Sequence, residues 1–261
     1  MTSSPSLTAV DALPTAAAQA APALSRKTNP RVWEVTYLVN RALIRDLREM
    51  VGRWFPRAAS PRILDVGCGS MPYRALFDER CREYLGCDAY TRAPGIVNCP
   101  AEALIFDDES FEAVVSFEVL EHVRQPWKVV AECARVLRRG GILLLSTPFI
   151  FPHHASPHDY FRYTHDGLRA LGEDAGLEVL ELRAQCTSFA TLLLVLNWHV
   201  MRFLNFFNRR ALTRPLSWLL RWGAVVPANL LGAALDAKPL RAPADQPNHG
   251  CANFLIAFRK P

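Results

Sequence analysis

A short apolar strand that ends in a tight glycine turn constrains this chain more than any other feature. Residues 62–70 read Arg-Ile-Leu-Asp-Val-Gly-Cys-Gly-Ser, so an apolar pair leads into Asp65 and then into Gly67 and Gly69. Glycine has no Cβ, so it can adopt positive φ and lets a ligand lie directly on the backbone. A strand, such a turn and a helix form the usual binding segment for a nucleotide-like cofactor in an open α/β sheet.

Strand and helix patterns alternate after this turn. Short apolar strands that alternate with helices indicate a mostly parallel sheet covered on both faces, so the predicted fold class is α/β. Pro126 suits the first turn of a helix, and Gly140-Gly141 is typical of a helix end. The predicted strands are 62–66, 83–87, 95–98, 112–117, 141–146, 177–183 and 252–258, and the predicted helices of the core are 72–80, 126–138 and 165–175.

Composition divides the chain into five regions. We predict a disordered tail (1–30), an N-terminal amphipathic helix (31–56), the core (57–186), an apolar helical insertion (187–250) and a final strand of the core (251–261). The tail is rich in Ala, Pro, Ser and Thr without periodicity, whereas apolar residues recur at helical spacing from Val32 to Trp54.

Overall composition is that of a folded protein that does not bind nucleic acid. Of 261 residues, 50% are hydrophobic and 21% are charged, and a net charge of +5 is too small to indicate a nucleic-acid partner. The seven cysteines contain no CxxC pair, which favours neither a disulfide framework nor a zinc site. With no signal-peptide pattern at the start, we expect reduced thiols and a cytoplasmic location, with peripheral contact at the inner face of the membrane as an open alternative.

An acidic residue follows the second predicted strand. Asp88 comes about 20 positions after the glycine turn, where open α/β folds place a carboxylate that accepts hydrogen bonds from ribose hydroxyls. An isolated Asp there more often begins a loop. Combined with the turn at 65–69, it favours cofactor binding.

Further motifs follow in order, with Ala101-Glu102 after the third strand and Leu-Glu-His-Val at 120–123 after the fourth. Together with Asp-Val-Gly-Cys-Gly at 65–69, this run resembles the class I S-adenosylmethionine-dependent methyltransferases over about residues 60–185 and again in the last strand. The resemblance implies a Rossmann-like, seven-stranded, mostly parallel sheet with an antiparallel final strand, and S-adenosylmethionine as cofactor. Ser70 replaces the third glycine of the first motif, and Glu112 stands where this group usually has Asp.

The resemblance also implies roles for the matching residues. The methionine and ribose portion of the cofactor would lie on Asp65, Gly67 and Gly69, and its ribose hydroxyls on Asp88. The adenine would face Ala101 and Glu102, and the far side of the cofactor would be lined by Phe117 and Glu118.

Histidines after the fourth and fifth strands are the candidates for catalysis. Transfer to a hydroxyl or amine benefits from a general base, and His122, His154 and His158 are predicted for that role. For His122, a packing or capping role is an equal alternative. His153, Asp159, Tyr160 and Arg162 are predicted to contact substrate, against the alternative of a solvated loop anchored by its aromatic residues. The Asp-Tyr-Phe-Arg-Tyr-Thr string at 159–164 resembles methyltransferases encoded with cell-surface glycan biosynthesis enzymes.

Carboxylates beside an imidazole raise the question of a metal. Glu118, Glu121 and His122 resemble the Glu-x-x-Glu-His that binds a divalent ion in ubiquinone-type O-methyltransferases. Many relatives carry these residues with no need for metal, so we predict none.

Residues 187–235 are long apolar stretches interrupted by arginines. Asn197, His199 and Arg202 break the first stretch before it reaches the roughly 20 residues that span a bilayer. The segment therefore suits a lid over the site, a homodimer interface or peripheral contact with a membrane.

The predicted activity is transfer of a methyl group to a small-molecule or lipid-linked acceptor, with an oxygen of a sugar or isoprenoid-like compound favoured. The alternatives are a non-catalytic protein that binds S-adenosylmethionine and a nicotinamide-dependent oxidoreductase. The lack of Gly-x-Gly-x-x-Gly spacing argues against the oxidoreductase.

Overall fold

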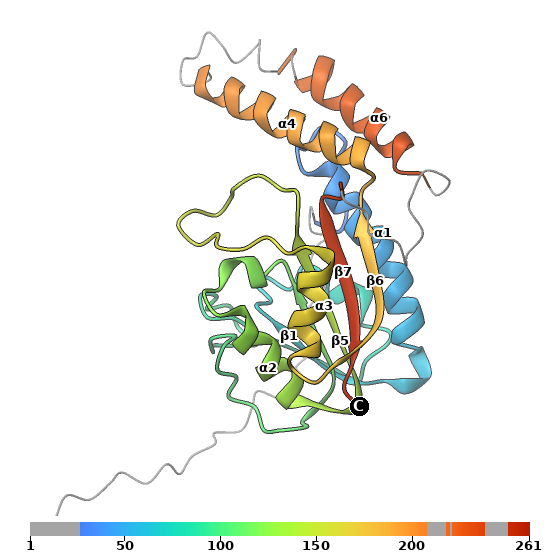
Figure 1. The fold of residues 1–261 in the computed structure, drawn as a ribbon, viewed down its shortest axis with the longest axis vertical. Helices are drawn as coiled ribbons and strands as arrows, with labels where there is room; N and C mark the ends of the chain where they lie inside the picture. The colour runs from blue at the N-terminus through green and yellow to red at the C-terminus, as the bar shows by residue number, and fades with distance from the viewer. Residues whose placement is uncertain (1–26, 208–217, 220, 238–249) are drawn as a thin grey trace, which may run out of the picture.

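A seven-stranded sheet forms the centre of the computed structural model, which describes residues 27–207, 218–219, 221–237 and 250–261 (Figure 1). The strand order is β3-β2-β1-β4-β5-β7-β6. The first five strands pair in parallel, and β7 lies antiparallel between β5 and β6. The predicted fold class is confirmed. The strands are β1 (Arg62–Val66), β2 (Glu83–Cys87), β3 (Ile96–Val97), β4 (Phe111–Phe117), β5 (Leu137–Pro148), β6 (Glu178–Gln185) and β7 (Asn253–Arg259).

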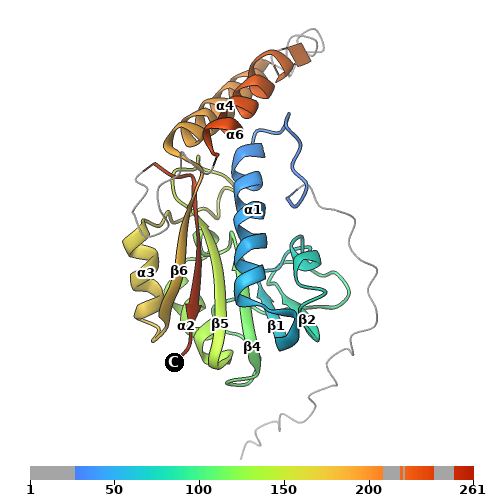
Figure 2. The same ribbon diagram turned by 90° about the vertical axis from the view of Figure 1, so that its right-hand side faces the viewer.

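Helices cover both faces of the sheet (Figures 1 and 2). One buried cluster joins α2 and α3 to the sheet, and a second joins α1 to the opposite face. Because β1 and β4 are largely buried, most of their side chains are apolar, with Arg62, Asp65, Glu112 and Ser116 as the exceptions. The helices are α1 (Tyr37–Trp54), α2 (Pro126–Val136), α3 (His165–Glu173), α4 (Ser188–Phe207) and α6 (Val226–Leu235), with 3₁₀ turns at Arg57–Ala59, Arg74–Leu76 and Leu120–His122 and a π-helical turn at Arg221–Val225.

The predicted helix at 72–80 is wrong. Only a 3₁₀ turn, Arg74–Leu76, forms there. The backbone N–H groups of Arg74, Leu76, Phe77 and Arg80 each donate to the carbonyl of the third residue before. Tyr73 and Phe77 are buried in this turn, with their rings 5.0 Å and 6.5 Å from Phe117. Packing of these rings against the sheet therefore fixes a series of tight turns instead of a helix.

The glycine pair that was predicted to end the helix at 126–138 lies inside a strand. Helix α2 ends at Val136, and β5 begins at the next residue and runs to Pro148. Gly140 has φ +76°, and the β4–β5 register shifts between Phe111 and Ala113. The positive φ of Gly140 thus permits the register shift in the pairing of β4 with the start of β5.

The insertion between β6 and β7 contains two apolar helices. Helices α4 and α6 lie side by side, run in opposite directions and project beyond one end of the sheet (Figures 1 and 2). Their inner ends pack on the first turns of α1. The predicted tail lies outside the described residues up to residue 26, as do parts of the predicted insertion.

Candidate active site

The carboxyl ends of β1, β2 and β4 open into a cavity of about 450 Å³. Parallel strands end at the same edge, so residues far apart in sequence meet there. Of the predicted site residues, the cavity is lined by Gly67, Asp88, Ala101, Glu102, Glu118, His122, His158 and Tyr160. Tyr90, Cys99 and Val119 also line it and were not predicted.

The glycine turn keeps the floor of this cavity clear. Gly67 has φ +69°, and a Cβ built on it would lie 2.5 Å from Cγ2 of Val119. Gly69 has φ +52° and open space where a Cβ would stand. The first glycine therefore fits a close contact with Val119, two residues after β4, and the second leaves bare backbone toward a neighbouring hollow.

Asp88 presents an ionised carboxylate at the edge of the cavity. Its Oδ1 accepts hydrogen bonds from the backbone N–H groups of Tyr90 and Thr91, both at 2.8 Å, and its Oδ2 accepts one from Gly69 at 3.0 Å. Burial acts to raise the pKa of Asp88, but these backbone donors outweigh burial and hold the pKa below its ordinary value. The carboxylate is thus fixed in its acceptor form beside the glycine turn.

A second hollow, of about 300 Å³, lies on the other side of Gly67. Asp65 lines it and is almost fully buried, and burial raises the pKa of its carboxyl to about 7 against the opposing hydrogen bond from Tyr84. The Tyr84 hydroxyl donates to Oδ2 of Asp65 at 2.7 Å. Other lining residues include Lys27, Gly69, Tyr73, Phe117 and Glu118.

Glu118 separates the two hollows and is held by residues from two other strands. Its Oε1 accepts hydrogen bonds from Ser146 Oγ at 2.6 Å and from Asn253 Nδ2 at 3.0 Å. Glu118 has φ +57°, a conformation that few non-glycine residues adopt. These two contacts therefore fix the direction of its carboxylate.

The two hollows together fit an adenosyl sulfonium such as S-adenosylmethionine. The larger offers a fixed carboxylate, Asp88, for ribose hydroxyls and a wall with Ala101 and Glu102 for a flat base. The smaller is lined by the side chains of Asp65 and Glu118, acidic groups that suit the amino end of such a molecule. Both hollows share Gly67, where ligand can lie on bare backbone.

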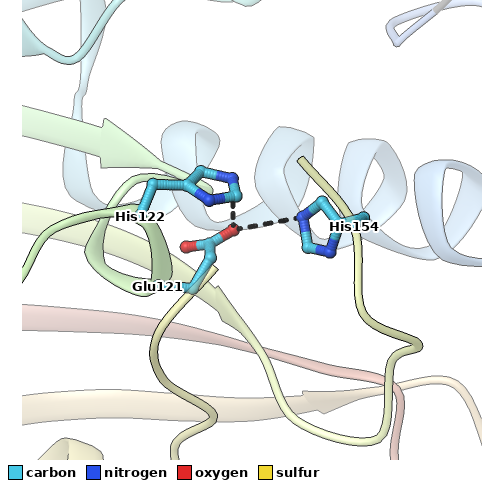
Figure 3. A group of neighbouring side chains, drawn as sticks. All are labelled: Glu121, His122 and His154. Atoms are coloured by element: carbon cyan, nitrogen blue, oxygen red, sulfur yellow. Dashed lines mark ion pairs between the residues drawn. The ribbon is translucent and has the colours of Figure 1, made fainter. Parts of the chain in front are cut away.

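Two imidazoles flank a buried carboxylate at the inner side of the larger cavity (Figure 3). Glu121 Oε1 lies 3.5 Å from Nε2 of His122 and 4.0 Å from Nε2 of His154. Burial, with the charge of Glu118, raises the pKa of Glu121 well above its ordinary value. Among the described residues, neither oxygen of Glu121 has a hydrogen-bond partner. His122 lines the cavity, whereas His154 lies behind it, with the two ring centroids 5.0 Å apart.

These three residues also have the spacing of a metal site. One ligand atom from each of Glu121, His122 and His154 lies within 4.8 Å of the other two. Glu118, which the sequence resemblance includes in such a site, is not part of this group. The expectation that the reaction needs no metal stays a prediction.

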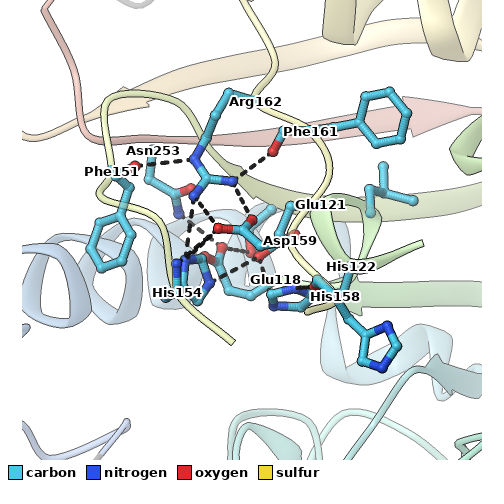
Figure 4. A network of polar contacts seen from close by, with 12 residues as sticks. Glu118, Glu121, His122, Phe151, His154, His158, Asp159, Phe161, Arg162 and Asn253 are labelled. Carbon is cyan, nitrogen blue, oxygen red and sulfur yellow. Dashed lines mark hydrogen bonds and ion pairs between the residues drawn. The ribbon is translucent and has the colours of Figure 1, made fainter. Parts of the chain in front are cut away.

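An internal ion pair holds the loop after β5 (Figure 4). Arg162 donates to both carboxylate oxygens of Asp159, at 2.6 Å and 2.8 Å, and to the carbonyl of Phe151 at 3.1 Å. Asp159 also accepts from the backbone N–H of His154 at 2.8 Å. Asp159 and Arg162 thus shape the loop from inside, and neither lines the larger cavity. Their predicted contact with substrate stays a prediction.

Three other residues of this loop, His153, His158 and Tyr160, were predicted to belong to the site. His158 and Tyr160 line the cavity, and Nδ1 of His158 lies 3.1 Å from the Tyr160 hydroxyl. His153 lies away from this cavity, in a groove between the loop and α4.

Comparison with known families agrees with this geometry. A family model described as a methyltransferase domain matches residues 64–145, which run from β1 to β5. Residues 64–145 of the sheet core therefore match a methyltransferase domain. The cofactor is S-adenosylmethionine, and the matched residues include the glycine turn, Asp88, Ala101, Glu102, Phe117, Glu118 and His122.

Relatives and solved structures carry the same domain. The chain is 33% identical over 123 residues to an uncharacterized methyltransferase of Mycobacterium leprae, covering 41% of this chain and 46% of that one. It is 32% identical over 139 residues to a probable S-adenosylmethionine-dependent methyltransferase of Mycolicibacterium smegmatis, covering 49% and 52%. These matches span about half of each relative's length.

A solved structure extends the likeness to the fold. Phosphoethanolamine N-methyltransferase 2 of Haemonchus contortus, in complex with S-adenosyl-L-methionine, has a TM-score of 0.53 at 15% identity and covers 88% of this chain and 56% of that one.

Proposed function

We propose that this chain transfers a methyl group from S-adenosylmethionine to an oxygen atom of a small or lipid-linked acceptor, such as a sugar or an isoprenoid-like compound. One observation carries the proposal: a single cavity connects the fixed carboxylate of Asp88 with the imidazoles of His122 and His158. Cofactor-binding and proton-accepting groups therefore share one space, as an in-line displacement requires. The cofactor supplies the electrophilic methyl group.

His122 is the favoured general base. Its Nδ1 lies 2.6 Å from the backbone carbonyl of His158, so Nδ1 carries the proton and donates it to that oxygen. Nε2 is then the nitrogen with a lone pair, and it can take the proton of an acceptor hydroxyl. Oε1 of Glu121 lies 3.5 Å from the same nitrogen. Burial raises the pKa of this carboxyl, but a positive charge on His122 would favour its ionised form, which would in turn stabilise the imidazolium.

The remaining loop residues support this arrangement. Burial lowers the pKa of His154, which favours the neutral ring beside His122. His158 and Tyr160, on the outer side of the cavity, are the best placed of the loop residues to contact the acceptor.

A groove supports the lipid-linked class of acceptor. It has a volume of about 400 Å³ and lies between the loop after β5 and helix α4. Apolar walls beside cationic and imidazole groups suit a molecule with an apolar chain and a polar or anionic head. The groove is lined by Phe149, Ile150, Phe151, Pro152, His153, Val195, Trp198, His199 and Arg202. Phe151 contacts both His154 and Trp198, so the groove adjoins the histidine pair.

The test is incubation of the purified protein with methyl-labelled S-adenosylmethionine and fractionated cell extract, including the lipid fraction. We expect label in one product, with the methyl group on oxygen. Cofactor binding with no labelled product in any fraction would favour the binding-protein alternative. Tight binding of NADH without binding of S-adenosylmethionine would favour the oxidoreductase.

The role of His122 has its own test. His122→Ala should lower kcat by about 100- to 10,000-fold, the usual contribution of a general base, and leave the cofactor Kd unchanged. His165→Ala, at the start of α3 and outside the cavity, is the matched control. Unchanged turnover in His122→Ala would remove His122 from this role.

A further inference from the structure

Helices α4 and α6 bury polar side chains between them. Asn197 of α4 donates to Oδ1 of Asn229 of α6 at 3.0 Å, and Asn229 donates to the backbone carbonyls of Val32 and Glu34 at 2.6 Å and 2.9 Å. Both asparagines are almost fully buried. Asp236, just after α6, is buried as well and pairs with Arg45 of α1.

The solvent side of the same helices is apolar. On α4, Phe189, Leu192 and Leu196 are 69%, 64% and 53% exposed and recur at helical spacing along one face. On α6, Leu230 and Leu231 are 56% and 54% exposed. We call these five side chains the apolar face of the hairpin.

An ordinary surface helix turns its apolar stripe to the core and its polar residues to water. Helix α4 buries apolar residues such as Ala190 and Leu194 as well, so it carries apolar side chains on its inner and outer sides. Full burial of one Leu or Phe side chain stabilises by roughly 1.5–3 kcal/mol, so five exposed ones favour an apolar environment strongly. Exposed apolar patches of this kind mark contact with a protein or a membrane.

The charge of residues 187–235 indicates whether the partner is a second copy of the protein or a membrane. Residues 187–235 contain no Asp or Glu, and their charged residues are Arg202, Arg209, Arg210, Arg214 and Arg221. A two-fold contact with a second copy would bring the same surface of both chains together, so the arginines of this segment would find none of its own acidic residues opposite them. An anionic lipid surface supplies the opposite charge.

We propose that the α4–α6 hairpin docks on the surface of an anionic lipid bilayer through its apolar face. Among the described residues, no helix has both the length and the apolar character to cross a bilayer, so the hairpin lies in the interface. Trp218 and Trp222, 61% and 46% exposed, are the residue type that settles at the headgroup level. The hairpin projects from the sheet domain, so the core stays clear of the surface (Figure 2).

The test is co-sedimentation of the full chain with phosphatidylcholine vesicles, with and without about 30% phosphatidylglycerol. We expect pelleting with the anionic vesicles only, and weaker pelleting at high salt. The variant Leu192→Gln/Leu196→Gln/Leu230→Gln/Leu231→Gln should lower the partition coefficient by at least about tenfold, because it removes most of the inserted apolar surface.

Ile105→Gln/Trp127→Gln is the matched control, since these residues are 66% and 54% exposed on the core, away from the hairpin. It should bind vesicles like the wild type. Cofactor binding, measured by calorimetry, should be the same in all variants and shows that each is folded. This readout also separates failure of membrane docking from failure of the proposed function.

Two results would overturn the proposal. One is wild-type protein that stays in the supernatant, or pellets equally, with both kinds of vesicle. The other is a dimer in light scattering that the four-leucine variant converts to a monomer without any vesicle binding, because the apolar face would then belong to a second copy.

Discussion

Asp65 in β1 and Asp88 just after β2 lie in different environments, which shift their pKa values in opposite directions. Asp88 accepts three backbone hydrogen bonds, which keep its pKa low. Asp65, one strand away, is buried with a tyrosine hydroxyl as its donor, and its pKa rises to about 7. Spacing from the glycine turn was enough to predict both positions, but it could not predict this contrast.

Asp88→Asn should weaken binding of S-adenosylmethionine by roughly 10- to 100-fold. Hydrogen bonds to a charged group contribute about 1.5–3 kcal/mol, and the amide keeps the shape of the side chain while losing its charge. Calorimetry measures the Kd. Asp107→Asn, on the exposed loop before β4, is the control, and equal affinity in the two variants would contradict the assigned role of Asp88.

Asp65 should make stability fall as pH rises from about 4 to about 7. Its folded pKa of about 7 lies above its ordinary 3.8, so in this range the folded state holds a proton that the unfolded state has released. The loss is at most about 4 kcal/mol, at about 1.4 kcal/mol per pKa unit.

The variant Asp65→Asn mimics the protonated carboxyl and should lack this loss. Guanidinium unfolding of both proteins at pH 4, 5.5 and 7.5 measures it. A difference between wild type and variant that stays constant with pH would show that Asp65 does not titrate in this range.

At the scale of elements, the pattern of apolar residues predicted the strands, because their position depends mainly on burial of their side chains in the core. Apart from β5, which begins four residues before its predicted start, the strands were expected close to their observed bounds, because strands buried in the core are mostly apolar. The turn at Arg74–Leu76 was missed because contacts of Tyr73 and Phe77 with distant rings set its shape.

In the candidate site, too, some features could be predicted from local sequence and others could not. Asp88, Glu102 and His122 follow strand ends, so local sequence placed them at the cavity. The donors to Glu118 come from β5 and β7, and the donor to Asp65 comes from β2. Such pairs depend on the register between strands, which the sequence pattern does not contain. The Asp159–Arg162 pair, three residues apart, is a contact that spacing could have suggested.

Helix α3 lies so close to β7 that one position requires glycine. A Cβ on Gly172 would lie 2.1 Å from Cε1 of Phe258, which is fully buried. Gly172→Ala should therefore destabilise the protein by about 1–3 kcal/mol, as overpacking of a core does. Thermal unfolding measures the effect.

Gly52→Ala is the control for that substitution. Gly52 lies in α1 with nothing within 4 Å of a built Cβ, so alanine there should stabilise by about 0.5–1 kcal/mol. A Gly172→Ala protein as stable as this control would show that the α3–β7 contact is looser than described.

For the whole molecule, the last residues of the chain complete the sheet. Strand β7 lies between β5 and β6 and is fully buried along most of its length. Strand β6 pairs with β7 alone among the described strands, so it depends on β7 for attachment to the sheet.

Removal of residues 250–261 should abolish cooperative unfolding. Without β7, the edges of β5 and β6 lose their backbone partners and both faces of the core are opened. Near-ultraviolet circular dichroism during thermal unfolding measures this. A truncated protein with a sharp transition would contradict the prediction.

Gln185 and Asn253 are paired across β6 and β7, and the helical hairpin leaves the sheet just after the first and returns just before the second. The excursion therefore begins and ends at one point, and a short turn between these residues would restore an ordinary strand connection. Apart from its contacts with α1 and with the loop after β5, such a segment can be gained, lost or exchanged while the sheet and the larger cavity stay intact. The hairpin and the cavity at the strand ends can thus evolve as separate parts of one chain.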